Sequence, residues 1–285
     1  MSCDIDLHTH SNASDGELSP AAVVRRAKEK GVCHLALTDH DTTSGIAEAQ
    51  SAASRAGVRL IPGVELSVTW DNRCLHVLGL NIDPKNQGLS QGLEQLRETR
   101  IQRAQKIGGK LEKKGIFGAF EGAAQLAGPG MITRTHFSRF LVGQGHCPTL
   151  QRAFDQYLGR GKDAYVPTEW VEMETGLAWI RAAGGIAVLA HPLRYKFTAT
   201  GMRKLLEVFR AAGGQGIEVV CGNSTPDDVQ VSARFARDFG LLGSVGSDFH
   251  SPGLLWNDVG RLRDFPRQVE PVWTRLGIQS VAFAS

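Results

Sequence analysis

Short apolar segments alternate with amphipathic helical segments along most of the chain, and this alternation restricts the possible folds more than any other feature of the sequence. Apolar segments of this length suit buried strands, and the helical segments between them suit the crossover connections of a parallel sheet. The pattern predicts strands over residues 3–7, 34–38, 59–68, 75–80, 186–190, 217–220 and 241–245. We therefore expect an α/β fold, with a barrel as the first interpretation and an open doubly wound sheet as the second.

Local signals support individual elements of this pattern. Ser19 followed by Pro20 predicts the start of a helix over residues 20–30, because serine caps a helix N-terminus and proline suits the first helical position. The dipeptide Asp71-Asn72 separates two strand segments and predicts a hairpin between them. Further helices are predicted over residues 44–56, 175–183, 202–212 and 226–239.

The alternation stops after residue 84 and resumes only in the second half of the chain. A long, charged helical segment covers residues 89–114, and shorter helical pieces follow it up to residue 158. We interpret this region as an inserted helical subdomain. The chain then divides into a first barrel part over residues 1–97, the insertion over 98–167 and a second barrel part over 168–285.

Composition excludes several classes of protein. The 285 residues are 42% hydrophobic and 21% charged with a net charge of +3, which suits a globular core and gives no chain-wide attraction to nucleic acid or membrane. The five cysteines are scattered and form no CxxC pair, which indicates a reduced protein without a thiolate zinc site. The sequence has neither a signal peptide pattern nor an apolar run of membrane-spanning length. We expect a cytoplasmic protein with no membrane partner and no obligate protein partner.

Histidines and acidic residues gather near the ends of the predicted strands. His8 and His10 should share one side of the chain, because side chains alternate along a strand. Active sites of α/β barrels lie where the C-terminal ends of the strands meet, so the residues of different motifs should converge there. The residues concerned are His8, His10, Asp15, His40, Glu65, His76, His191, Asp248 and His250.

This concentration of ionisable groups indicates a metal centre. Burying so many of them would cost roughly several kcal/mol each unless they are paired or bound to a metal. Any one of the motifs alone could be structural, and the prediction depends on their combination. A set of His, Asp and Glu without thiolates favours manganese, iron or zinc over magnesium or calcium.

The motifs DLHTHSNASDG, LTDHD, PGVELSV, HVLGL, AHP and GSDFH resemble, in the same order, those of the PHP (polymerase and histidinol phosphatase) superfamily. They extend from residue 6 to residue 250. The resemblance implies a distorted seven-stranded (β/α) barrel of PHP type with an inserted helical subdomain. It also implies two or three divalent metals per chain, commonly Mn2+ with Fe2+ or Zn2+ as alternatives, and it makes the nine residues named above their ligands.

Within the superfamily, the chain is most similar to the nucleoside 3′,5′-bisphosphate phosphatases, some relatives of which are 5′→3′ exoribonucleases on short RNA. The segment ITRTHFSR over residues 132–139 resembles an Arg-x-His stretch of that subgroup. We therefore expect removal of the 3′-phosphate from a nucleotide substrate, with short RNA oligonucleotides as possible partners. Arginine makes planar, two-pronged contacts to phosphate. The predicted substrate-binding residues are Arg103, Arg134, His136 and Arg194.

For Arg100 and Arg103, an ordinary solvated helix face is at least as good an explanation. Glu65 is the candidate for a carboxylate that bridges two cations, which together could lower the pKa of a bridging water and orient it for attack on phosphorus. His191 or His250 could alternatively deliver a proton to the leaving oxygen.

Four other functions remain open. The same metals could serve a 5′→3′ exonuclease or a histidinol-phosphate phosphatase. A C–N hydrolase of the amidohydrolase type also uses a His-x-His pair and a terminal Asp, although Asp15, His40 and Glu65 count against it. The complete set of candidate ligands counts against a non-catalytic, metal-binding regulator.

Overall fold

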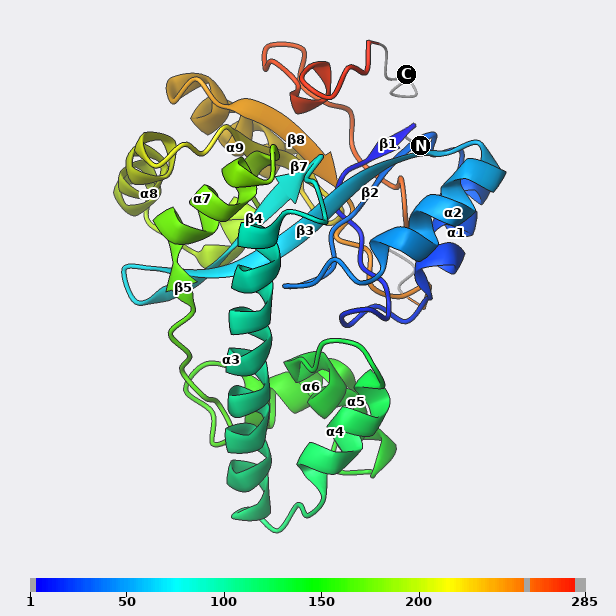
Figure 1. The fold of residues 1–285 in the computed structure, drawn as a ribbon. Helices are drawn as coiled ribbons and strands as arrows, with labels where there is room; N and C mark the ends of the chain where they lie inside the picture. The colour runs from blue at the N-terminus through cyan, green and yellow to red at the C-terminus, as the bar shows by residue number, and fades with distance from the viewer. Residues whose placement is uncertain (1–3, 254–256, 280–285) are drawn as a thin grey trace.

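The main sheet of the protein is mixed and nearly closed into a barrel (Figure 1). The computed structural model describes residues 4–253 and 257–279. In spatial order the strands are β1 (Ile5–Asp6), β2 (His34–Leu37), β3 (Arg59–Trp70), β4 (Arg73–Leu80), β6 (Ile186–Leu189), β7 (Gly216–Cys221) and β8 (Leu242–Gly246). These are the seven predicted strands, although Cys3, with which the first was predicted to begin, lies outside the described residues. The sequence pattern did not predict the short strand β5 (Val171–Glu172), which pairs with β3.

Backbone hydrogen bonds between the segment that follows β1 and the end of β8 with the residues after it distinguish the barrel from the open sheet. The Leu7 amide donates to the Val245 carbonyl at 3.1 Å, and the His10 amide donates to the Phe249 carbonyl at 2.9 Å. These bonds bring β1 beside β8, so the ends of the sheet meet. The predicted barrel is confirmed, and the open doubly wound alternative is wrong.

Strand β4 is the exception to the parallel arrangement, because it runs antiparallel to both β3 and β6. The turn that precedes it contains Asp71 at a φ of 48° and Asn72 at a φ of 56°. Two consecutive positive φ angles are typical of a tight hairpin, and Asn and Asp tolerate them better than most residues. The predicted hairpin is confirmed, and it places the N-terminal half of β4 beside the later residues of β3.

Helices cover the outside of the sheet. In Figure 1, α1 (Pro20–Glu29) and α2 (Ile46–Ala56) lie on one side, and α7 (Met173–Ala182), α8 (Ala199–Ala211) and α9 (Pro226–Asp238) lie on the other. The short 3₁₀ turns are η2 (Pro192–Tyr195) and η3 (Val272–Thr274). The Ser19 hydroxyl accepts a hydrogen bond from the Ala22 amide at 3.3 Å, as predicted for the cap of α1. None of the helices in the described part of the chain combines the length and apolar character of a membrane span.

The insertion projects from the barrel along the long helix α3 (Gln87–Glu112), as Figure 1 shows. Its other elements are α4 (Ala119–Ala127), α5 (Arg134–Gly143), α6 (Leu150–Ala153) and the π-helical turn η1 (Phe154–Leu158). A separate apolar core, with members from Ala104 to Val166, packs these elements together. A separate core is expected of an inserted subdomain. The exact boundaries of the insertion, residues 98 and 167, stay an interpretation.

Candidate metal centre

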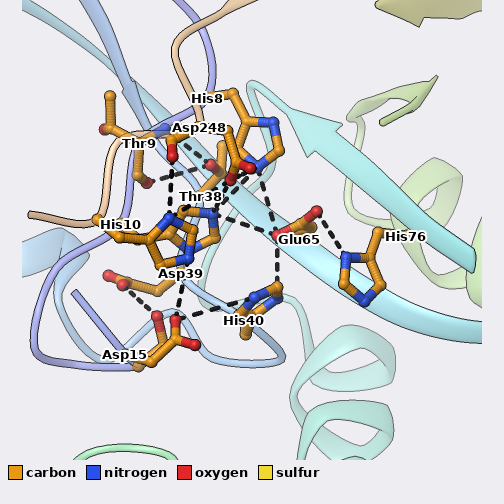
Figure 2. Close-up of polar contacts among 12 residues, drawn as sticks. His8, Thr9, His10, Asp15, Thr38, Asp39, His40, Glu65, His76 and Asp248 are labelled. Carbon is orange, nitrogen blue, oxygen red and sulfur yellow. Dashed lines mark hydrogen bonds and ion pairs between the residues drawn. The ribbon is translucent and has the colours of Figure 1, made fainter. Parts of the chain in front are cut away.

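The carboxylate of Glu65 lies in the middle of a cluster of imidazoles at one mouth of the barrel (Figure 2). Its Oε1 atom is 2.9 Å from His76 Nδ1 and 3.0 Å from His191 Nε2. Its Oε2 atom is 2.9 Å from His40 Nδ1. Glu65 is fully buried within β3. Its carboxylate contacts side chains that come from several parts of the barrel.

The loops after β1 and β8 complete the cluster. The Nε2 atoms of His8 and His10 lie 3.0 Å apart, as expected for side chains on one side of the chain. Both atoms are within 3.3 Å of Glu65 Oε2 and of Asp248 Oδ1. His250 Nε2 is 3.3 Å from Asp15 Oδ1. All nine predicted residues are therefore brought together at this mouth.

Eight of the nine residues, all except His191, have ligand atoms that form three overlapping groups, and within each group the atoms lie within 4.8 Å of one another. Each pair of groups has one residue in common, which is Glu65, His10 or His40, and each group could hold a metal ion. The groups are His8, His10, Glu65 and Asp248; His10, Asp15, His40 and His250; and His40, Glu65 and His76.

Unsatisfied polar atoms within the cluster test whether a cation fits. Among the described residues, Glu65 Oε2, Asp15 Oδ1 and His40 Nδ1 are buried and make no hydrogen bond of good geometry, although Glu65 Oε2 and His40 Nδ1 lie 2.9 Å apart. Leaving such an atom unpaired costs about 1–3 kcal/mol, so a native site needs something to satisfy it. Neutral imidazole nitrogens and carboxylate oxygens around a shared space are the donor set of Mn2+, Fe2+ or Zn2+. The residues present fit such ions.

The charges in the cluster keep its carboxylates ionised. Burial opposes ionisation of Glu65, but His40 and His76 outweigh it and hold its pKa well below the usual value. The pKa of Asp248 is likewise well below its usual value, because Arg194 and His8 outweigh the effect of burial. Burial would lower the pKa of His10, but the adjacent carboxylates of Asp248 and Glu65 outweigh this effect and raise it to about 9. The carboxylates of Glu65 and Asp248 thus stay ionised, which is the form that binds a metal cation.

His76 reaches the cluster for a reason that differs from our expectation. We expected every member at or near the C-terminal end of a strand. His76 instead lies in the N-terminal half of β4, where it pairs with Ser67 of β3. Because β4 is antiparallel, its first residues lie at the mouth where β3 and β6 end. The predicted position of His76 in the cluster was therefore right, but the expectation that it follows the C-terminal end of its strand was wrong.

Two other acidic residues of the motifs, Asp6 and Asp39, make hydrogen bonds with the loops around the cluster. Asp6 accepts hydrogen bonds from the amides of Ser247 and Gly260, both at 2.9 Å. Asp39 accepts from the hydroxyls of Ser11 and Ser14, both at 2.7 Å. These bonds hold the loops that carry the cluster.

Glu218 of β7 supports two of the cluster histidines from behind. Its Oε1 atom is 2.9 Å from His8 Nδ1, and its Oε2 atom accepts a hydrogen bond from the His191 amide at 2.6 Å. Glu218 was not among the predicted site residues, and its contacts show that it supports two of them.

A cavity of about 830 Å³ lies between the cluster and the insertion. Arg103 of α3, Arg134 of α5 and Arg194 of η2 line it, together with His191 and His250. Burial, with repulsion from Arg134 and Arg100, lowers the pKa of Arg103 to about 9. An anion beside Arg103 and Arg134 would relieve that repulsion, so the part of the cavity wall that the insertion contributes suits a phosphate.

The structure does not bring His136 to this wall. It is almost fully buried, and its Nδ1 atom accepts a hydrogen bond from the Thr133 amide at 3.0 Å, which closes a capping box at the start of α5. Its proposed contact with substrate stays a prediction that this position does not support.

Arg100 is not on a solvated helix face, so that explanation is wrong for this residue. It is 5% exposed and binds Asp41 at 2.6 Å, with Ser67 as a further partner at 2.9 Å. Arg103 also contributes to the cavity wall and is not simply a solvated cation.

Comparison with known proteins agrees with this geometry. A family model described as PHP domain matches residues 6–158. The chain belongs to the PHP domain family. It is 46% identical to a 3′,5′-nucleoside bisphosphate phosphatase of Chromobacterium violaceum, over 96% of both chains. It is also 48% identical to a 5′-3′ exoribonuclease of Haemophilus influenzae, over 96% of this chain and all of that protein.

Two solved structures share the fold of this PHP protein. One, from Chromobacterium violaceum, is described as an amidohydrolase with bound sulfate and no metal; it is 46% identical, with a TM-score of 0.92 over 96% of both chains. The other is a metal-dependent phosphoesterase by its description, from Bifidobacterium adolescentis, 27% identical with a TM-score of 0.82 over 93% of both chains.

Proposed function

We propose that this PHP protein is a metal-dependent phosphatase that removes the 3′-phosphate from nucleoside 3′,5′-bisphosphates. The observation that carries the proposal is the cavity with two unlike walls: one is the His/Asp/Glu cluster, and the other contains Arg103 and Arg134. A bisphosphate has two anionic groups separated by a nucleoside, which matches this arrangement. The relative from Chromobacterium violaceum with that activity supports the same conclusion.

The proposal includes two or three divalent metals per chain, with Mn2+ preferred and Fe2+ or Zn2+ as alternatives. When bound, such ions supply an activated water and neutralise charge on the phosphoryl group. The proposed ligands are His8, His10, Asp15, His40, Glu65, His76, His191, Asp248 and His250.

Individual side chains then have separate tasks. Each carboxylate oxygen of Glu65 lies beside another proposed ligand, Oε1 beside His76 and Oε2 beside His40. Glu65 could therefore contact two cations, one with each oxygen. Arg194 binds Asp248 and also lines the cavity, so it keeps that carboxylate in place and offers its remaining donors to the scissile phosphate. His191 and His250 both line the cavity, and either one, as an alternative to binding a cation, could hold a proton near the leaving oxygen.

The arginines that the insertion contributes to the cavity would recognise the 5′-phosphate. Arg103 stacks near Trp170, with 5.5 Å between the guanidinium carbon and the ring centroid, and Arg134 similarly lies 5.7 Å from Phe154. Stacking fixes the direction of each guanidinium, so less entropy is lost when it binds phosphate. The cavity is within the range of about 300–1,000 Å³ typical of small-molecule sites.

A cytoplasmic location is part of the proposal. The four cysteines in the described part of the chain are all free, as a reducing compartment would keep them.

The direct test uses metal-free protein reconstituted with Mn2+, Fe2+ or Zn2+. Release of inorganic phosphate and a nucleoside 5′-phosphate from a nucleoside 3′,5′-bisphosphate is expected. Absence of phosphate release with every metal would overturn the proposal. Histidinol phosphate and an amide substrate serve as comparison substrates, because turnover of either in preference to the bisphosphate would favour those chemistries.

The second candidate is a 5′→3′ exoribonuclease, favoured by the relatives with that name in Haemophilus influenzae and Escherichia coli. The chemistry at the cluster would be the same, with a nucleotide chain in place of a hydrogen on the scissile phosphate. A 5′-phosphorylated RNA dinucleotide distinguishes the two, because release of mononucleotides indicates the nuclease.

A further inference from the structure

The carboxylate of Asp15 faces two environments. Its Oδ1 atom is directed to the cluster, 3.3 Å from His250 Nε2 and 3.8 Å from His40 Nε2, and it has no hydrogen-bond partner among the described residues. Its Oδ2 atom accepts hydrogen bonds from the Thr133 hydroxyl at 3.1 Å and the Thr135 hydroxyl at 2.9 Å. One oxygen is thus fixed by the insertion, and the other is left for the cation position.

The backbone around Asp15 also rests on the insertion. Arg139 Nη2 donates to the Asp15 carbonyl at 2.9 Å, and the Met131 amide donates to the Ala13 carbonyl at 2.9 Å. A Cβ atom at Gly130 would lie 2.4 Å from the Asn12 carbonyl oxygen, so only glycine allows this close approach. The contact between the loop and the insertion is therefore tight and continuous.

Between the two threonines lies Arg134, which lines the cavity. Three consecutive residues at the start of α5 therefore contact both the metal cluster and the cavity. The hydroxyls at Thr133 and Thr135 hold a candidate metal ligand, and the guanidinium at Arg134 lies in the wall that suits the distal phosphate. Movement of this turn would displace both.

We propose that Thr133 and Thr135 are positioning residues that set the Asp15 carboxylate for metal binding, so that the inserted subdomain completes the metal centre as well as the substrate wall. The inference rests on the proposed function, because it assigns Asp15 to a cation. It gives the insertion a role that distal-phosphate recognition alone does not require.

The physical reason is rotational freedom. If the carboxylate oxygen that faces away from the cation makes no hydrogen bond, the side chain samples several rotamers. The entropy lost in ordering the side chain then reduces the free energy of cation binding. Two hydroxyl donors order it in advance, as outer hydrogen bonds generally do for metal ligands. Their loss typically lowers metal affinity or activity by roughly 10- to 100-fold.

The two hydroxyls also line the cavity, so contact with substrate is the competing explanation. The two roles predict different results. A substrate contact would affect KM for the bisphosphate and leave metal binding of the free protein unchanged. A positioning role would lower metal affinity without any substrate and would reduce turnover of a simple aryl phosphate equally.

Thr135→Val is the cleaner variant, because Thr133 also caps α5 by accepting from the Thr135 amide. Valine keeps the shape of threonine without the hydroxyl, and Thr135→Ser is the matched control that keeps the hydroxyl. The measurement is titration of the metal-free protein with Mn2+, with bound metal quantified per chain. We expect the affinity of the weakest site to fall about 10- to 100-fold in Thr135→Val and to be retained in Thr135→Ser.

A double-mutant cycle with Asp15→Ala separates positioning from general damage. If Thr135 acts through Asp15, the double variant binds metal no worse than Asp15→Ala alone, whereas unrelated structural losses would add. Unchanged Mn2+ binding in Thr135→Val, or full additivity in the cycle, overturns the inference. Phosphate release from the bisphosphate by the unaltered protein reports on the proposed function independently.

Discussion

His8 Nδ1 lies 2.9 Å from Oε1 of Glu218, and both side chains are completely buried. The other oxygen of Glu218 accepts a hydrogen bond from the His191 amide. A carboxylate in this position keeps the proton of His8 on Nδ1 and leaves Nε2 free to face Glu65 and Asp248. The orientation of the candidate metal ligand His8 is therefore set by a residue of β7 that is 210 positions away in the sequence.

Glu218→Gln should weaken metal binding while preserving shape. The two oxygens of Glu218 face two donors, whereas glutamine offers only one acceptor oxygen, so one donor is left facing an NH₂ group. We expect a loss of roughly 10- to 100-fold in metal affinity. Titration of metal-free protein with Mn2+ measures it, and Glu207→Gln, on the exposed side of α8, is the control. Identical binding by the two variants would exclude this role for Glu218.

Replacement of His8 by Ala or Asp248 by Asn should abolish turnover together with metal content. Both residues belong to the group that also contains His10 and Glu65, so either replacement removes a ligand from that group. Glu65 also belongs to the group with His40 and His76, so the effect should extend to a second cation. Elemental analysis of the purified variants measures the metal, and phosphate release measures turnover. Unchanged metal stoichiometry in both variants would remove them from the proposed ligands.

Replacement of Arg134 by Ala should mainly raise KM for substrates that carry a distal phosphate. A hydrogen bond to a charged group contributes about 1.5–3 kcal/mol, which corresponds to a rise of roughly 10- to 100-fold. Kinetics with a nucleoside bisphosphate and with an aryl phosphate, which has no distal group, provide the comparison. Arg97→Ala on the exposed side of α3 is the control. Equal effects of Arg134→Ala on the two substrates would contradict the assigned contact.

Much of the barrel and of the cluster could be predicted because it depends on local patterns. Alternation along an extended chain places His8 and His10 on one side, although β1 itself ends at Asp6, and their Nε2 atoms lie 3.0 Å apart. The Asp71-Asn72 pair likewise predicted the hairpin from turn chemistry alone. Each of these predictions needs only residues that are close in sequence.

The remaining features depend on packing between distant segments. Asp15 and Thr135 are 120 residues apart, and nothing in either segment indicates that the insertion folds back onto the Asp15 loop. His136 was assigned to substrate because its motif resembles a known stretch, whereas the local capping geometry turns its ring toward Thr133. Which side of a helix is buried is decided by the whole fold, and the sequence of α3 did not reveal it for Arg100.

Arg100→Met should destabilise the protein more than its position on a charged helix suggests. Its partner Asp41 is fully buried, next to the candidate ligand His40, and has a positive φ of 51°. Removal of the arginine leaves a buried carboxylate without its cation, and breaking a buried pair in this way typically costs about 3–5 kcal/mol. Urea unfolding of metal-free protein measures the loss, with Arg97→Met as the exposed control. Asp41→Asn combined with Arg100→Met should recover part of the stability, because the uncompensated charge is then absent. A loss for Arg100→Met no larger than that for Arg97→Met would show that the ion pair contributes little to the free energy of unfolding.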